Sequence, residues 1–285
     1  MIRAQLLNLS TVDPVWAISG LTSLTQRQSI RESILSLANN DPNAFSHAKD
    51  GSKLSLEHKN IKGSEIFNHN AVIDLSSKLL SPATISIFSQ NFHKSKSNFR
   101  SFMGNSYSSL IPIDIQRWRA SSSNIQCNPS WFNDPNIDSF DTVNQLMQNY
   151  SLAYNAIPFI PNMQFSIMRR GSYIPPHTDV SNKIATLIIY LPSSQQTDSL
   201  LGTTFWSPKS HHHCRQSEST FLKDSNLSIF RDNYQPIRTP FQGDNAILFF
   251  RSNSSWHSFE YDSTFDEEPR VSINVNFLFP VSSKL

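Results

Sequence analysis

Two side chains with metal-binding chemistry lie two residues apart in the segment Tyr173–Asp179. His177 and Asp179 follow the rigid dipeptide Pro175-Pro176. In an extended segment alternate side chains point to the same face, so the imidazole and the carboxylate would lie together. These groups can take two adjacent positions on a divalent metal. A second histidine would complete the two-histidine, one-carboxylate triad of non-haem Fe(II) sites.

His257 is the best candidate for the third ligand. It lies in the segment Ser255–Phe259, shortly after the apolar run Ala246–Phe250, which predicts a buried strand. Taken alone, such a histidine is more often a core residue bonded to the backbone. A sheet closed on itself would bring its strand next to that of His177, and the metal-site interpretation is then favoured.

The segment His211–Cys214 offers a rival metal site. Adjacent residues of a strand point to opposite faces, so only His211 and His213 could share one metal. Cys214 has no partner at a spacing typical of zinc sites, and a histidine-rich loop is therefore the favoured interpretation. The other four histidines are interpreted as surface residues: His47, His58, His69 and His93.

Arg270 begins a further apolar segment, Val271–Phe279, and Ser272 would share its face of the strand. An arginine that points into a core is costly unless it meets an anion. A guanidinium fork beside a hydroxyl group suits a carboxylate. A metal with open positions and an inward arginine together indicate a keto acid that chelates the metal.

This ordered set resembles the Fe(II)/2-oxoglutarate-dependent dioxygenase superfamily, specifically its prolyl-4-hydroxylase-like branch. The resemblance covers about residues 160–280. It differs from the family pattern in having one glycine, Gly202, where two are common, and a long acidic stretch before Arg270. The matching features are the His177-x-Asp179 pair, Tyr190 within Thr186–Leu191, Gly202–Phe205, Gly243–Phe249, His257 and Arg270-x-Ser272.

The resemblance implies a site in which His177, Asp179 and His257 hold Fe(II). Arg270 and Ser272 would bind the distal carboxylate of 2-oxoglutarate, the co-substrate, and Tyr190 would hydrogen-bond to it. O2 would be the remaining reactant, with succinate and CO2 as co-products. The expected reaction is hydroxylation of an unactivated C–H bond, because a carboxylate stands where related halogenases have a small residue. Desaturation and demethylation remain open.

The substrate and the class of protein have alternatives. A small molecule or biosynthetic intermediate ranks first as substrate, and a prolyl or other amino-acid side chain of a protein or peptide ranks second. A non-catalytic jelly-roll protein that binds a metal or ligand is the main alternative of another class, and a structural protein with an incidental triad is a further one. A zinc hydrolase would use the same triad but would leave Arg270 unexplained.

The pattern of apolar residues predicts an α+β protein. Helical spacing predicts helices over 22–38, 72–80, 83–92 and 139–154, in a mainly helical region (1–158) that supports the core and could form the substrate site. Extended segments are expected over 1–20, and a long surface excursion over 39–70. Region 159–285 is expected to form a double-stranded β-helix (jelly-roll) catalytic core from short strands: Met163–Met168, Ile184–Leu191, Thr203–Trp206, Leu227–Phe230, Ala246–Phe250, Trp256–Phe259 and Val271–Phe279.

Composition narrows the classes further. The 285 residues carry a net charge of +2, which argues against a general nucleic-acid-binding protein. Basic residues between 93 and 119 are interpreted as a solvated face, with an anion-attracting rim as the minority view. Two cysteines, Cys127 and Cys214, exclude a disulfide framework. With no apolar run of membrane-spanning length and no signal-like start, a cytoplasmic protein is expected, and its oligomeric state stays open.

Overall fold

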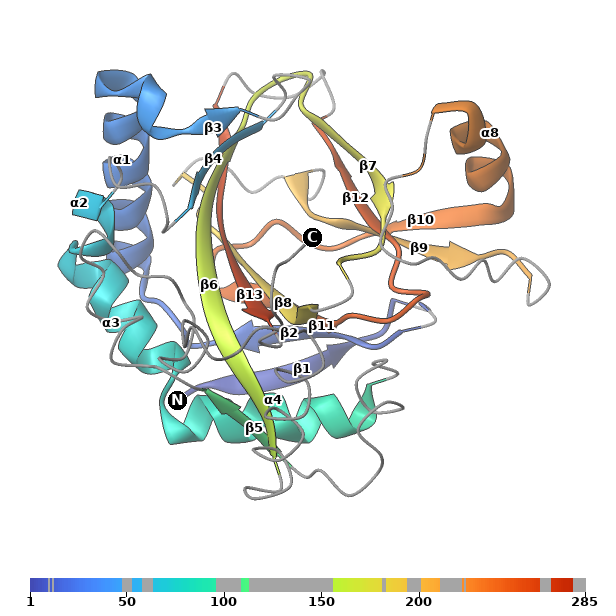
Figure 1. The fold of residues 1–285 in the computed structure, drawn as a ribbon, viewed down its shortest axis with the longest axis horizontal. Helices are drawn as coiled ribbons and strands as arrows, with labels where there is room; N and C mark the ends of the chain where they lie inside the picture. The colour runs from blue at the N-terminus through green and yellow to red at the C-terminus, as the bar shows by residue number, and fades with distance from the viewer. Residues whose placement is uncertain are drawn as a thin grey trace, which may run out of the picture.

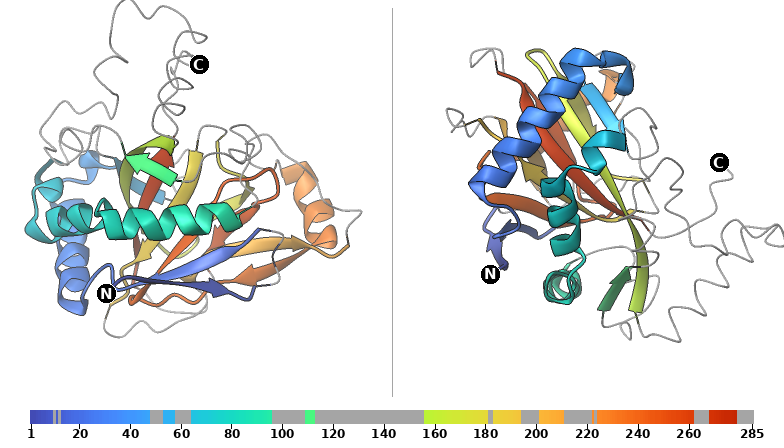
Figure 2. Two further views of the ribbon diagram at one scale, coloured as in Figure 1. Left: turned by 90° about the horizontal axis from the view of Figure 1, so that it is seen from below. Right: turned by 90° about the vertical axis from the view of Figure 1, so that its left-hand side faces the viewer.

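A computed structural model describes residues 1–9, 11, 13–47, 53–57, 64–95, 109–112, 156–180, 183–193, 201–210, 222, 224–261 and 268–278. Two sheets face each other, and helices cover the face of the larger sheet that points away from the smaller one (Figures 1 and 2). The predicted helix over 139–154, the histidine segment 211–214 and most of the basic stretch 93–119 lie outside the described residues.

The larger sheet contains strands from both halves of the chain. Neighbouring strands within this sheet are antiparallel, apart from the parallel pairing of β5 (Ser109–Pro112) with β6. Along the sheet the order is β1 (Arg3–Leu7), β2 (Val15–Ser19), β11 (Asn245–Phe250), β8 (Lys183–Tyr190), β13 (Arg270–Leu278), β6 (Ala156–Met168), β4 (Lys53–Glu57) and β3 (Ser46–His47). The two extended segments predicted near the start of the chain are confirmed as β1 and β2.

The smaller sheet has four antiparallel strands in the order β10 (Tyr234–Arg238), β9 (Thr204–Pro208), β12 (His257–Glu260) and β7 (Tyr173–His177). From β6 onward the chain passes back and forth between the sheets, because β6, β8, β11 and β13 belong to the larger sheet and the strands between them to the smaller one. This winding places β12 directly beside β7, although they are far apart in the sequence.

The two faces of the larger sheet have different partners, as strand alternation requires. Side chains on the outer face are buried against the helices, among them Ile18, Leu187, Leu248 and Phe277. Side chains on the inner face meet the smaller sheet, and this second cluster includes Val15, Tyr190, Phe205, Phe249 and Phe259. The candidate site residues lie on the inner face and on the smaller sheet.

Three of the predicted helices are confirmed as α1 (Leu24–Asn40), α3 (Asn70–Leu79) and α4 (Pro82–Lys94). Helix α1 begins with a capping box, in which the Ser23 and Gln26 side chains each accept a hydrogen bond from the other residue's backbone N–H. Within the described residues no single helix is long and apolar enough to cross a membrane. The pair α3 and α4, bent by 52°, reaches that length and composition only when counted together.

Two expectations are wrong. Leu227–Phe230 is part of helix α8 (Asp224–Asn233) and is not a strand. A short apolar run does not by itself distinguish a helix from a strand. In the helix, Phe230 is buried against Trp206 and Trp256, whereas Ile229 is exposed. Part of the expected surface excursion over 39–70 forms β3, β4 and the short helix α2 (Ser64–Phe67). In β4 polar and apolar residues alternate, and Leu56 is fully buried.

Arg31 ties helix α1 to the ends of β8 and β13. Its guanidinium is buried and donates to the backbone oxygens of Leu191 (2.8 Å) and Pro269 (3.2 Å), and to the Glu268 carboxylate (3.1 Å). Burial lowers the pKa of this guanidinium, and Glu268 partly offsets that effect. The contacts fix the chain immediately before Arg270, so the helical layer contributes to where that arginine lies.

Candidate metal centre

The predicted triad comes together at one edge of the smaller sheet. His177 ends β7 and lies opposite His257, the first residue of β12, and their ring centroids are 4.2 Å apart. Asp179 follows two residues after β7, with its Oδ1 atom 3.9 Å from His257 Nε2. One ligand atom from each of the three side chains lies within 4.8 Å of the others, the only such group of three among the described residues.

Backbone carbonyls orient both imidazoles. His177 Nδ1 lies 2.9 Å from the Pro175 oxygen, and His257 Nδ1 lies 3.0 Å from the Ser255 oxygen. A protonated Nδ1 donates to such a carbonyl and leaves the Nε2 lone pair for a metal, which is the usual arrangement in histidine metal sites. The carbonyl of Pro175, the first proline of the Pro-Pro step, therefore fixes the orientation of the His177 ring.

Both histidines are held in the neutral form that ligates metals. Burial, reinforced by the neighbouring His257, lowers the pKa of the half-buried His177 to about 3. Burial also lowers the pKa of His257, against the opposing effect of Asp179. Protons therefore compete weakly with a metal for these nitrogens near neutral pH.

Asp179 is ionised and held from three sides. Its Oδ1 accepts a hydrogen bond from Lys183 Nζ at 2.6 Å, its Oδ2 accepts one from Thr186 Oγ1 at 2.8 Å, and Arg251 Nε donates to its backbone oxygen at 3.2 Å. Burial alone would raise the pKa of this carboxyl, but Lys183 and the two histidines outweigh burial and hold the pKa well below its usual range. Each carboxylate oxygen has a second lone pair, so these bonds leave acceptor capacity for a cation.

A turn of serines connects His257 to the start of the chain. Asp13 is buried and its Oδ2 accepts from Ser254 Oγ at 2.7 Å. Ser254 Oγ in turn contacts Ser252 Oγ (3.0 Å), and Ser252 exchanges hydrogen bonds with Ser255, whose carbonyl meets His257. Asp13 thus stabilises the turn that orients the His257 ring. In the sequence, the Asp13-Pro14 step indicates only a turn.

Asp13→Asn is expected to weaken divalent-metal binding about 10-fold, because outer-shell partners of metal-ligating histidines typically contribute ~10–100-fold to affinity. Anaerobic titration with Co(II), followed by visible absorption, measures the effect. Ser254→Ala removes the other partner of the same bond, so the double variant should bind no more weakly than either single variant. Asp232→Asn, on the exposed face of α8, is the matched control. If Tm falls while Co(II) affinity is unchanged, the turn is structural only.

A cavity of about 130 Å³ adjoins the triad, and its walls include residues of β4, β6, β8 and β13. Arg270 lies in this wall and is only 4% exposed. Its Nε donates to the Leu201 oxygen (2.7 Å), and Nη1 donates to Ser272 Oγ (3.3 Å) and contacts Met168 Sδ (3.4 Å). The guanidinium also lies 4.3 Å from the centroid of the Phe259 ring.

Among the described residues, no acidic side chain balances the charge of Arg270. No carboxylate forms an ion pair with it in the part of the chain that the structure describes. Burial lowers the pKa of its guanidinium, yet an arginine starts so high that it keeps its charge in proteins. A buried cation of this kind is stabilised by an anionic ligand.

Tyr190 and Ser272 take supporting positions. The Tyr190 hydroxyl contacts the hydroxyls of Thr203 and Thr239, each at 2.9 Å, and accepts from Thr203 N–H at 2.9 Å. A hydroxyl group has one O–H to donate and two lone pairs to accept with, so these three contacts use all of the hydrogen-bonding capacity of the Tyr190 hydroxyl. The Tyr190 ring lies 5.2 Å from the Arg270 guanidinium, and neither Tyr190 nor Ser272 lines the cavity. Their direct contact with a co-substrate stays a prediction.

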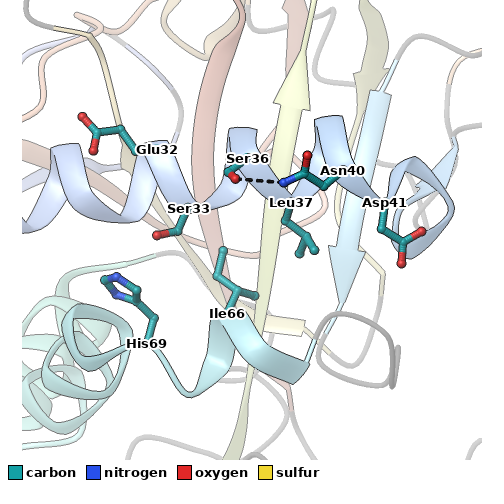
Figure 3. A pocket seen from close by; sticks show the side chains of 8 residues that line it. All are labelled: Glu32, Ser33, Ser36, Leu37, Asn40, Asp41, Ile66 and His69. Carbon is teal, nitrogen blue, oxygen red and sulfur yellow. Dashed lines mark hydrogen bonds between the residues drawn. The ribbon is translucent and has the colours of Figure 1, made fainter.

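A second, larger pocket lies outside the site (Figure 3). Its volume is about 670 Å³, and its side chains come from α1 and its C-terminal end and from the chain at α2. His69, expected at the surface, points into it and has structural partners: its Nδ1 accepts from the Ala71 N–H at the start of α3, and its Nε2 lies 3.3 Å from Ser29 Oγ. His58 and the segment His211–Cys214 lie outside the described residues.

Comparisons with known proteins find similarity at the level of structure. No protein-family model and no curated protein sequence matches the chain. It is similar to the crystal structure of a prolyl-4-hydroxylase from Pseudomonas putida, with a TM-score of 0.38 and 10% identity over 93% of this chain and 92% of that chain. It is also similar to SnoK, a non-haem α-ketoglutarate-dependent carbocyclase from nogalamycin biosynthesis, with a TM-score of 0.44 and 10% identity over 93% and 79% of the two chains.

A third similar structure is an oxidoreductase of the 2OG-Fe(II) oxygenase family from Burkholderia pseudomallei, with a TM-score of 0.29 and 13% identity over 49% of this chain and 57% of that chain. With TM-scores below 0.5 and identities of 10–13%, the reaction has to be argued from the site residues of this chain alone.

Proposed function

We propose that the protein is an Fe(II)/2-oxoglutarate-dependent dioxygenase that hydroxylates an unactivated C–H bond of a small molecule and releases succinate and CO2. The observation that carries this proposal is the triad His177, Asp179 and His257, with ligand atoms within 4.8 Å of one another beside a buried arginine. Two histidines and one carboxylate with open positions are typical of non-haem Fe(II) oxygenases.

The winding of the chain supports a jelly-roll core for this enzyme. The strands β6 to β13 divide equally between the facing sheets, in the orders β11-β8-β13-β6 and β10-β9-β12-β7. That pattern is the one expected of an eight-stranded double-stranded β-helix. In it the ligands come from β7, from the residues that follow it and from β12, at the mouth between the sheets.

The donor atoms fit Fe(II). Two neutral imidazole nitrogens and one ionised carboxylate suit this ion, and the backbone bonds to both Nδ1 atoms leave Nε2 as the donor. When bound, the iron together with 2-oxoglutarate and O2 supplies the oxidising power for the C–H bond, which protein side chains lack. His177, Asp179 and His257 would hold the metal.

Arg270 would bind the distal carboxylate of 2-oxoglutarate. Its planar guanidinium can form two parallel hydrogen bonds to a carboxylate, and burial strengthens such a pair. Ser272 and the Leu201 carbonyl fix its orientation. The rings of Phe259 and Tyr190 pack beside the guanidinium and exclude water around it. Tyr190 would then act through Arg270 by packing.

A non-catalytic jelly-roll protein that binds a small ligand is the second candidate, and one contact favours it. Lys183 Nζ lies 2.6 Å from Asp179 Oδ1, the carboxylate oxygen that also lies nearest to His257. An ammonium group can compensate a carboxylate without any metal. This candidate predicts neither iron-dependent absorption nor succinate.

Anaerobic spectroscopy with turnover separates the two candidates. We expect a weak visible charge-transfer band when Fe(II) and 2-oxoglutarate are both present. Neither Fe(II) alone nor 2-oxoglutarate alone should give this band. Admission of O2 should then release succinate, at a rate that a true substrate increases. A protein that binds Fe(II) stoichiometrically but never develops the band would contradict the proposal.

A further inference from the structure

One row of side chains crosses the inner face of the larger sheet at the level of the proposed metal ligand Asp179. Asn162 on β6 lies opposite Asn276 on β13, and Asn276 lies opposite Thr186 on β8. Side chains in such a row point to the same face. Thr186 donates to Asp179 Oδ2 at 2.8 Å, so the row leads from this carboxylate to the two asparagines.

The amide of Asn162 contains a buried polar atom that the protein does not use. The side chain is half-buried, and its Oδ1 atom is shielded from solvent and accepts no hydrogen bond from the described residues. A buried carbonyl oxygen without a donor costs free energy, and such an atom calls for an explanation in any native structure. A ligand that donates to Oδ1 would remove this cost.

Asn276 continues this polar surface toward the triad. It is half-buried and lines the cavity beside the triad, and its side chain forms no hydrogen bond with the described residues. The Cβ atoms of directly opposed residues are ~4.5–5.5 Å apart, so one polar group of a ligand can reach both amides. The neighbouring amide of Asn274, by contrast, is already bonded to Ser166 Oγ at 3.2 Å.

The two asparagines lie far from the arginine proposed to bind 2-oxoglutarate. Asn276 follows Arg270 by six residues on β13, which corresponds to about 20 Å at ~3.3 Å per residue. Asn162 does not line the cavity of about 130 Å³ assigned to the metal and the co-substrate. The described strands β4 and β5 pair with other parts of β6, so neither stands beside Asn162. A group bound at this pair would therefore lie near Asp179 without competing for Arg270.

Charge narrows the class of the bound group. Asn162 Oδ1 can only accept a hydrogen bond, so its partner must donate an N–H or O–H. An ionised carboxylate has no proton to donate and would lose its hydration without compensation. An ammonium group would meet a cavity wall with three cationic side chains, Lys53, Lys183 and Arg270, against one acid, Asp179. An uncharged donor has neither disadvantage.

We propose that the substrate presents an uncharged N–H or O–H group, a carboxamide or a hydroxyl, to Asn162 and Asn276 on the wall formed by β6 and β13. This inference rests on the proposed dioxygenase function and narrows its substrate class. It makes the two asparagines specificity-determining residues. Carboxamide and hydroxyl share the required chemistry, and the two arms of the experiment separate them.

The test uses the full-length protein with Mn(II) in place of Fe(II) and with saturating 2-oxoglutarate. Propionamide and 1-propanol are the two probes, and propionate and propylammonium are the charged references. Paramagnetic Mn(II) shortens the proton relaxation times of a molecule that binds near it, so an NMR titration reports affinity and proximity together. We expect one of the two probes to bind near Mn(II), and the charged references to bind at least about 10-fold more weakly.

Three variants make the result specific. Asn162→Leu removes the amide at similar volume and should weaken probe binding about 3- to 10-fold, the usual value of a neutral hydrogen bond. Its Tm should not fall, because Oδ1 makes no bond within the described protein. Asn276→Ala tests the second amide independently and should weaken the same probe. Asn39→Ala, exposed near the end of α1, is the matched control and should change neither quantity.

Failures of the inference and of the proposed function give different signals. If no visible band forms with Fe(II) and 2-oxoglutarate, the dioxygenase proposal fails before any probe is added. If the band forms but neither probe approaches Mn(II), or propionate binds as tightly as propionamide, the inference is wrong. Unchanged probe affinity in both Asn162→Leu and Asn276→Ala, or weaker binding of 2-oxoglutarate in Asn162→Leu, would also overturn it.

Discussion

Replacement of His257 by alanine is expected to lower Fe(II) affinity by more than about 100-fold and to abolish succinate release. Changes to outer-shell partners already reduce metal affinity by ~10–100-fold, and the loss of a ligand should exceed this. His257 is one of three side chains proposed as metal donors, and the described residues contain no further histidine, cysteine or acid that completes such a group in its place.

Anaerobic titration with Fe(II) or Co(II) measures the loss, with His93→Ala at the end of α4 as the matched histidine control. Free imidazole added to His257→Ala should restore part of the metal binding, because it can fill the space that the side chain leaves. Destabilisation of the fold would not be reversed in this way. Tight metal binding by His257→Ala without imidazole would show that the triad is not the metal site.

Arg270→Ala is expected to raise the 2-oxoglutarate concentration needed for half-maximal turnover on the order of 100-fold. Truncating one partner of a buried, hydrogen-bonded charge pair costs about 2–5 kcal/mol, and each ~1.4 kcal/mol is tenfold. The distal carboxylate is remote from the reacting atoms, so its loss should weaken co-substrate binding more than it slows the chemical step. Arg270→Lys keeps the charge but not the planar fork and should be intermediate.

A change of co-substrate makes this test specific. 2-Oxobutyrate has no distal carboxylate, so the natural protein should strongly prefer 2-oxoglutarate over it. Arg270→Ala should lose that preference, whereas Arg231→Ala, on the exposed face of α8, should retain it. Undiminished preference in Arg270→Ala would remove this arginine from the co-substrate site.

The triad could be predicted from sequence because its chemistry is local and its strands are regular. His177 and Asp179 share a face through simple alternation, and His257 and Arg270 are the first residues of β12 and β13. The structure brings the three predicted ligands together and buries Arg270 at the same cavity.

Other contributors depend on pairings that no local pattern reveals. Lys53 reaches the cavity only because β4 pairs with β6, and the surrounding sequence is polar enough to resemble a loop. Asp13 meets Ser254 across most of the length of the chain. Lys183 follows Asp179 by four residues, a spacing that brings side chains together in a helix, but no helix is predicted there. A short apolar run also does not distinguish a helix from a strand, as Leu227–Phe230 in α8 demonstrates.

The pairing of β2 with β11 has a consequence for how the chain is made. Val15 lies opposite Phe249, so β2 can pair with β11 only after residue 249 has been synthesised. At ~5–20 residues per second, roughly 10–50 s pass between the two strands on the ribosome. During that interval the backbone N–H and C=O groups on that edge of β2 have no strand to pair with, and an unpaired strand edge favours association with other chains.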